Sequence, residues 1–99
     1  MTDQNNLPDE ITADIGLLIE RLRGHGIVVE GGEYARESFG NYYVELLVKN
    51  VRFRLIRDRS VYVLDGPAVS ELKNAGLWRG FYNRQEFEEQ VLSWIVALP

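Results

Sequence analysis

The sequence predicts an α+β fold, an antiparallel meander sheet of three to five strands flanked by an N-terminal and a C-terminal amphipathic helix. Residues 42–65 alternate apolar and polar side chains in three runs separated by short turns, and this period of two is typical of antiparallel strands. Apolar residues recur at helical spacing in one segment before these strands and in one after them. The 99 residues fit a single domain over 7–99, behind a flexible tail over 1–6.

The first predicted helix begins near Pro8, because proline suits the first helical position, and it ends at Gly24. Asp9 and Glu10 then lie in its first turn, where the helix dipole stabilises negative charge. One apolar stripe recurs along this helix and is expected to face the core: Ile11, Ile15, Leu18, Ile19 and Leu22.

A short strand is predicted over residues 27–30, and the glycine pair at 31–32 is a good signal for a two-residue hairpin turn. The return strand would run over residues 33–39. A simple turn after it would place Glu37 on the same face as Tyr42, an apolar position. A bulge, or a loop in place of the return strand, would relieve this conflict, and both alternatives stay open.

A comparison of possible turn positions predicts the register of the central strands. A turn at residues 49–50 sets Glu45 opposite Arg54 and Tyr43 opposite Ile56. A turn one residue later would oppose two cations and mix charged and apolar groups on both faces, which is unfavourable. We therefore expect the first register and a Glu45–Arg54 ion pair.

For the next hairpin, a turn at residues 58–59 sets Arg52 opposite Asp65 and Ile56 opposite Val61. An Arg52–Asp65 ion pair is therefore expected as well. Both turns agree on one core face: Val44, Leu46, Val48, Val51, Phe53, Leu55, Tyr62 and Leu64.

A short helix is expected over residues 68–75, closed by a glycine. The last helix has a clear start, because Asn83 is a good N-cap, Glu86 completes a capping box, and Tyr82 can pack on Phe87 as a hydrophobic staple. Its apolar stripe repeats that of the first helix: Phe87, Val91, Trp94, Ile95 and Leu98.

The net charge of −4 is unevenly spread, because residues 49–59 carry five bases against Asp58 alone. An acidic protein with one basic stretch is a poor general nucleic-acid binder, since phosphate affinity depends on a broad positive field. The chain has no cysteine, which excludes disulfides and suits a reducing cytoplasm. No apolar run approaches the ~20 residues of a membrane span. We therefore expect a cytoplasmic protein with no membrane partner.

The outer face of the central strands, opposite the core face, has the most informative pattern. Five of its nine residues are apolar, more than a solvated face would show: Tyr43, Glu45, Leu47, Arg52, Arg54, Ile56, Val61, Val63 and Asp65. Four explanations remain open: a helix covering this face, a homodimer seam, a surface for another protein, or an ordinary exposed face. Tyr43, Ile56 and Val61 are expected to cluster at one end. The candidate partner-binding residues are Tyr43, Glu45, Arg52, Arg54, Ile56, Arg57, Arg59, Val61 and Trp78.

Trp78 is a candidate because it lies in an aromatic cluster before the last helix and binds a partner only if it is exposed; core anchoring is the alternative. Arg57 and Arg59 flank Asp58 and point away from any identified partner.

No catalytic or metal-binding motif is found in the sequence. His25 is the only histidine, and no nucleophile or orienting group is marked near it. Most of the clustered acids lie in first helical turns, where the dipole explains them. The glycine pairs form no phosphate-binding loop. We therefore predict no enzyme and no cofactor.

The segment RFRLIRDRSVYVLD, followed by a tryptophan and a terminal amphipathic helix, resembles small uncharacterised bacterial α+β proteins of the immunity-protein kind, over residues 41–96. The resemblance implies toxin neutralisation and no catalytic residues. We therefore predict a non-catalytic protein-binding domain, a bacterial immunity or adaptor protein. The alternatives are a homodimeric structural protein, or a weak anion or nucleic-acid binder using the arginines of residues 52–59.

Overall fold

A computed structural model describes residues 7–38 and 40–98 of the chain. The elements follow the order α1 (Asp9–Gly24), β1 (Val28–Ala35), β2 (Asn41–Val48), β3 (Val51–Asp58), β4 (Val61–Asp65), α2 (Val69–Asn74) and α3 (Arg84–Val96). The strands form one antiparallel sheet in the order β1-β2-β3-β4. This confirms the predicted α+β class. The tail predicted over 1–6 lies outside the described residues.

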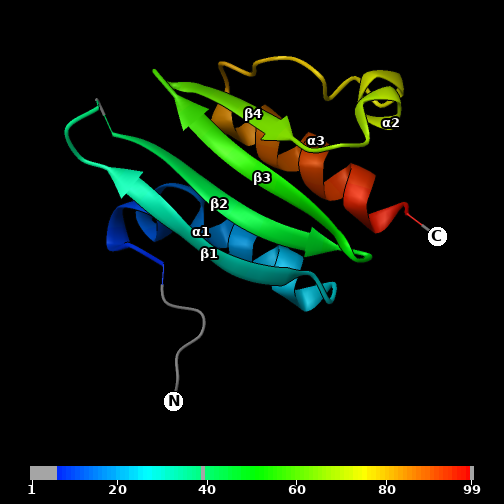
Figure 1. Ribbon diagram of the computed structural model, residues 1–99, viewed down its shortest axis with the longest axis horizontal. Coiled ribbons are helices and arrows are strands. Elements are labelled where there is room, and N and C mark those ends of the chain that lie inside the picture. Colours follow the sequence, from blue (N-terminus) through cyan, green and yellow to red (C-terminus); the bar gives the residue numbers. More distant parts are fainter. Residues whose placement is uncertain (1–6, 39, 99) are drawn as a thin grey trace.

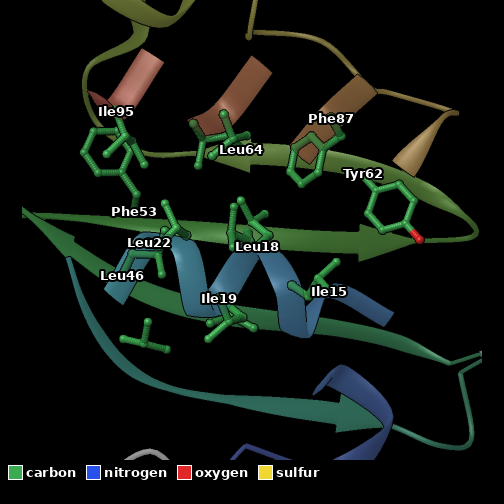
Figure 2. Close-up of a cluster of buried hydrophobic side chains, with 14 of the residues drawn as sticks. Ile15, Leu18, Ile19, Leu22, Leu46, Phe53, Tyr62, Leu64, Phe87 and Ile95 are labelled. Atoms are coloured by element: carbon green, nitrogen blue, oxygen red, sulfur yellow. The ribbon is translucent and has the colours of Figure 1, made fainter. Parts of the chain in front are cut away.

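Both long helices lie on the same side of the sheet, α1 behind β1 and β2 and α3 behind β3 and β4 (Figure 1). The core fills the space between the two layers, and Figure 2 shows helix and strand side chains meeting there. Leu18 and Leu46 are at most 2 % exposed, and the ring of Tyr62 stacks on that of Phe87 with centroids 5.4 Å apart. The sheet is therefore a two-faced element with one covered side.

The helix stripes pack as predicted, with every stripe residue of α1 buried and Phe87, Val91 and Ile95 of α3 buried. The side-chain oxygen of Asn83 accepts a hydrogen bond of 2.8 Å from the backbone N–H of Glu86, which confirms the N-cap of α3. The hydrophobic staple is wrong, because Tyr82 is 84 % exposed. No helix in the described part of the chain is long and apolar enough to cross a membrane.

The β2–β3 hairpin has the predicted register, with Glu45 opposite Arg54 and Tyr43 opposite Ile56. Its turn residues, Lys49 and Asn50, have φ values of 51° and 66°. Two successive left-handed residues define the type I′ turn, whose twist matches that of paired strands.

The predicted β3–β4 register is wrong by two residues. The turn lies at residues 59–60, so Ile56 pairs with Val63 rather than with Val61, and Arg54 rather than Arg52 lies opposite Asp65. Because side chains alternate with a period of two, a shift of two residues changes every partner but leaves every side chain on its predicted face.

The glycine pair 31–32 is not a hairpin turn, because β1 runs through it. A β-bulge lies between Val29 and Gly31, where Gly31 has a φ of 142°. A Cβ on Gly32 would lie 2.4 Å from the carbonyl oxygen of Tyr43, so only glycine lets the two strands approach this closely. Of the return strand predicted over residues 33–39, Glu33 to Ala35 form the end of β1, whereas residues 36–38 form a turn, so that part of the prediction is wrong. Phe39 lies outside the described part of the chain.

Candidate functional site: the outer face of the sheet

The outer face of the sheet is the side turned away from α1 and α3 (Figure 1). No helix among residues 7–38 and 40–98 packs on it, because α1 and α3 bury their stripes against the other side. The covering helix is therefore the one explanation of this face that the described structure contradicts. The face is formed by Val28, Glu30, Glu33, Tyr43, Glu45, Leu47, Arg52, Arg54, Ile56, Asp58, Val61, Val63 and Asp65.

Apolar side chains form a row across the middle strands. Tyr43 of β2 lies opposite Ile56 of β3, which lies opposite Val63 of β4. All three are partly exposed. Val61 lies one row further toward the turn, opposite Asp58, so the predicted cluster contains Val63 in its place. Val28 and Leu47 pair at the opposite end, and Val28 is 53 % exposed.

Two ion pairs order the arginines of this face. Arg54 donates to Glu45 with an N–O distance of 2.8 Å, as predicted, and its guanidinium lies 4.4 Å from the centroid of the Tyr43 ring. The predicted Arg52–Asp65 pair is wrong. Arg52 donates instead to both carboxylate oxygens of Glu30, at 2.7 and 3.2 Å, and this hydrogen bonding lowers the pKa of Glu30. The β-bulge places Glu30 for this contact.

A hollow of about 410 Å³ lies on the face where β1, β2 and β3 meet. Its lining includes Glu33, Tyr43, Ile56, Arg54 and Asp58. Partial burial raises the pKa of the Tyr43 hydroxyl, and the nearby Glu33 carboxylate raises it further. The hollow therefore combines an aromatic and an aliphatic side chain with a carboxylate.

The rim of the hollow is held by Asn41. Its side-chain amide donates to Asp58 at 3.2 Å, and its oxygen accepts a hydrogen bond of 2.8 Å from the backbone N–H of Arg59. The guanidinium of Arg59 also lies 3.4 Å from Asp58, although both side chains are exposed. Arg59 therefore belongs to the edge of the face and has a partner there, which corrects the expectation that it has none.

Arg57 points to the helix side of the sheet, not to the outer face. Its Nε lies 3.9 Å from Asp14 of α1, and its guanidinium lies 5.8 Å from the centroid of the Tyr62 ring. The hydroxyls of Tyr42 and Tyr62 donate to the same Asp14 carboxylate, at 2.7 and 2.8 Å. Arg57 is thus part of a partly exposed polar cluster on the helix side of the sheet, and the expectation that it points away from any partner is wrong.

Trp78 lies in the link between α2 and α3 and is 39 % exposed. Two backbone hydrogen bonds of 2.8 Å join Phe81 of the same link to Tyr62, so this link runs along the free edge of β4. Trp78 does not line the hollow. The structure therefore brings six of the nine predicted residues together on one face, with Arg59 at its edge: Tyr43, Glu45, Arg52, Arg54, Ile56 and Val61.

A second hollow of about 680 Å³ lies between α1 and α3, lined in part by the exposed Leu17 and Val96 and by Glu88. Partial burial raises the pKa of Glu88. His25 lines neither hollow and is exposed after the end of α1. Among the described residues, no group of three or more histidine or acidic side chains is placed to hold a metal ion.

Sequence reasoning missed Glu33, Asn41 and Asp58 as residues of the hollow. The predicted return strand contains Glu33 without a defined face, although the alternation Glu33, Tyr34, Ala35 continues the period of β1. The position of Val63 next to Ile56 follows only from the corrected β3–β4 register.

No known protein-family model matches the chain, and comparison with curated proteins and with solved structures found no significant match.

Proposed function

We propose that this chain is a non-catalytic protein-binding domain that docks its partner on the outer face of the sheet, in the manner of a bacterial immunity or adaptor protein of the cytoplasm. The observation that carries the proposal is a sheet face on which no helix of the described residues packs, and on which a row of apolar side chains adjoins ion-paired arginines. Aromatic residues and arginine are enriched in protein interfaces and supply most of their hot spots.

The arginines of the face are ordered before any partner arrives. Arg52 is held by two hydrogen bonds to Glu30, and Arg54 is held between Glu45 and the Tyr43 ring. Ordering a long side chain on binding costs roughly 0.5–1.5 kcal/mol. Because these arginines are already held in the free chain, binding a partner requires less of this ordering free energy. Apolar and guanidinium surface is thus presented in one fixed geometry.

The same pairs weaken the anion-binding alternative. Each arginine of residues 52–59 has a carboxylate within 4.0 Å, namely Glu30, Glu45, Asp14 or Asp58. A phosphate would have to compete with these carboxylates, and the chain as a whole has a net charge of −4. Protein binding needs no such exchange.

Affinity capture with variants that remove the arginine charges tests the proposal. The tagged chain is incubated with lysate of the organism that encodes it, and recovered proteins are quantified by mass spectrometry. Arg52→Gln with Arg54→Gln should reduce recovery of the specific partner by about tenfold or more, because two interface arginines each contribute about 1 kcal/mol or more. Thermal unfolding checks that the variant stays folded.

The matched control is Arg36→Gln with Arg79→Gln. These arginines also form exposed ion pairs, with Glu10 and Glu86, but they lie off the outer face. The control has the same charge change and should keep the partner. Equal recovery by wild type and the Arg52/Arg54 variant, or equal loss in both double variants, would exclude the outer face as the docking surface.

A further inference from the structure

The outer face has more carboxylates than it has cations to pair with them. Five carboxylates lie on its strands, Glu30, Glu33, Glu45, Asp58 and Asp65, and three of them are paired with Arg52, Arg54 and Arg59. Glu33 and Asp65 have no cationic partner within 4.0 Å among residues 7–38 and 40–98. The charge left to meet a partner is therefore negative.

The two unpaired carboxylates flank the apolar row. Glu33 lies opposite Tyr43 on the edge strand β1, and Asp65 ends β4 one row beyond Val63. The hollow over Tyr43 and Ile56 lies on the Glu33 side. A ligand that covers the apolar row thus meets a carboxylate at each side of the sheet.

This pattern is complementary to a chain that alternates apolar and cationic side chains. A lysine or arginine has an apolar stem that can lie on Tyr43 or Ile56 and a charged end that can reach Glu33. Both carboxylates are solvent-exposed, so they act mainly by steering and by excluding partners of the wrong charge.

A second copy of this chain is a poorer occupant. Face-to-face docking would bring four unpaired carboxylates together, because each copy contributes Glu33 and Asp65. Among the described residues at the border of the face, the unpaired cation is Lys49, in the β2–β3 turn. One such cation in each copy is fewer than the two unpaired carboxylates that each copy contributes. Like charges brought together across an interface oppose association.

We propose that the outer face recognises a cationic polypeptide segment, whose basic side chains meet Glu33 and Asp65 while its apolar side chains cover the Tyr43–Ile56 hollow. This inference rests on the proposed function and specifies the chemistry of the partner.

Two synthetic peptides test the charge preference directly. The ¹⁵N-labelled full chain is titrated in NMR experiments with a hexapeptide of alternating lysine and leucine, and separately with one of alternating glutamate and leucine. The basic peptide should shift the amide signals of residues around Tyr43 and Ile56 at up to millimolar concentration, and its affinity should fall as salt is raised. The acidic peptide should leave those signals in place.

The variant Glu33→Gln with Asp65→Asn should weaken binding of the basic peptide by about threefold to tenfold, since it removes two exposed charge contacts. The control, Glu20→Gln with Glu71→Gln, removes the same charge from exposed positions on the helices and should bind as wild type does. This control separates the effect of losing the local contacts from the effect of changing the net charge.

Three results would overturn the inference: equal binding of the acidic peptide, wild-type affinity in the Glu33/Asp65 variant, or no shift at the face with either peptide. A dimer mass by light scattering at high micromolar concentration, abolished by Ile56→Glu, would assign the face to a second copy instead. These outcomes leave the capture experiment on Arg52 and Arg54 to decide the proposed function separately, except the dimer, which would make the chain its own partner.

Discussion

Asp14 connects more elements than any other charged side chain named here. Its carboxylate accepts hydrogen bonds from Tyr42 of β2 and Tyr62 of β4, and it lies 3.5 Å from Arg84 of α3 and 3.9 Å from Arg57 of β3. The two tyrosines are buried, at 4 % and 6 % exposure. A buried hydroxyl without a partner is costly, so this one residue of α1 determines whether two strands can bury their tyrosines.

The cluster makes stability depend on pH on the alkaline side. Burial first, and then the hydrogen bond to Asp14, raises the pKa of Tyr62 to about 12, and the same causes raise the pKa of Tyr42 further. An unfolded tyrosine has a pKa of about 10. Between these values the unfolded chain loses a proton that the folded chain retains, so the stabilisation is complete below about pH 10 and is lost as pH rises toward about 12.

We therefore expect the urea midpoint to fall as pH rises through about 10 to 12, with a smaller fall in Tyr62→Phe than in wild type. Tyr82→Phe is the matched control, because Tyr82 is 84 % exposed, and it should follow the wild-type curve. Identical slopes in Tyr62→Phe and wild type would show that the hydroxyl of Tyr62 does not cause the dependence.

At the scale of elements, both tight hairpins depend on unusual backbone conformations. Arg59 and Ser60 have φ values of 53° and 67°, although neither residue is one that favours the left-handed region. The hydrogen bond from the Arg59 backbone N–H to Asn41 helps to hold this turn. The two residues of this turn are therefore poorly suited to the backbone conformation that they adopt.

Replacing Arg59 by Asn and Ser60 by Gly should raise the unfolding free energy by about 1 kcal/mol, because Asn-Gly matches a type I′ turn and relieves part of the roughly 1–2 kcal/mol that a left-handed residue costs. Loss of the exposed Arg59–Asp58 pair should offset little of this gain. Urea denaturation measures the change. The same pair introduced by Lys73→Asn with Asn74→Gly, at the end of α2, should lower stability instead, since glycine is unfavourable in helices. A loss of stability at both sites would contradict the turn assignment.

At the scale of the whole molecule, a single layer of helices covers one face of the sheet, and no described helix covers the other. Leu55 and Ile56 are neighbours on β3, yet Leu55 is 1 % exposed in the core while Ile56 lies on the outer face. The contrast between them measures how much of the stability depends on the covered face of the sheet rather than on the outer face.

Leu55→Ala should lower the unfolding free energy by about 2–5 kcal/mol, the usual range for a buried leucine. Ile56→Ala should lower it by about 1 kcal/mol or less, the span typical of half-exposed strand positions. Urea denaturation at low protein concentration compares them. Equal losses at the two positions would mean that something buries the outer face, and a concentration dependence would identify self-association as the cause.

Much of this architecture follows from local pattern. The stripes of α1 and α3, the Asn83 cap and the β2–β3 register are set by side-chain periodicity, a cap hydrogen bond and charge opposition between neighbouring strands. Each of these depends on residues close together in the sequence. The candidate face was also predictable, because strand alternation assigns every side chain to one of two sides.

The rest required contacts between distant segments. The bulge at Gly31 forms where Gly32 meets the Tyr43 carbonyl, and the β3–β4 register brings Tyr62 to Asp14, 48 residues away in the sequence. Arg52 pairs with Glu30 rather than with Asp65 because the bulge in β1 places Glu30 within hydrogen-bonding distance of Arg52. This contact, too, joins segments that are distant in the sequence. The sequence by itself determined which residues lie on each face of the sheet, because alternation is local. Only the tertiary structure decided which of them meet and that no described helix covers the outer face, because packing of distant elements sets both.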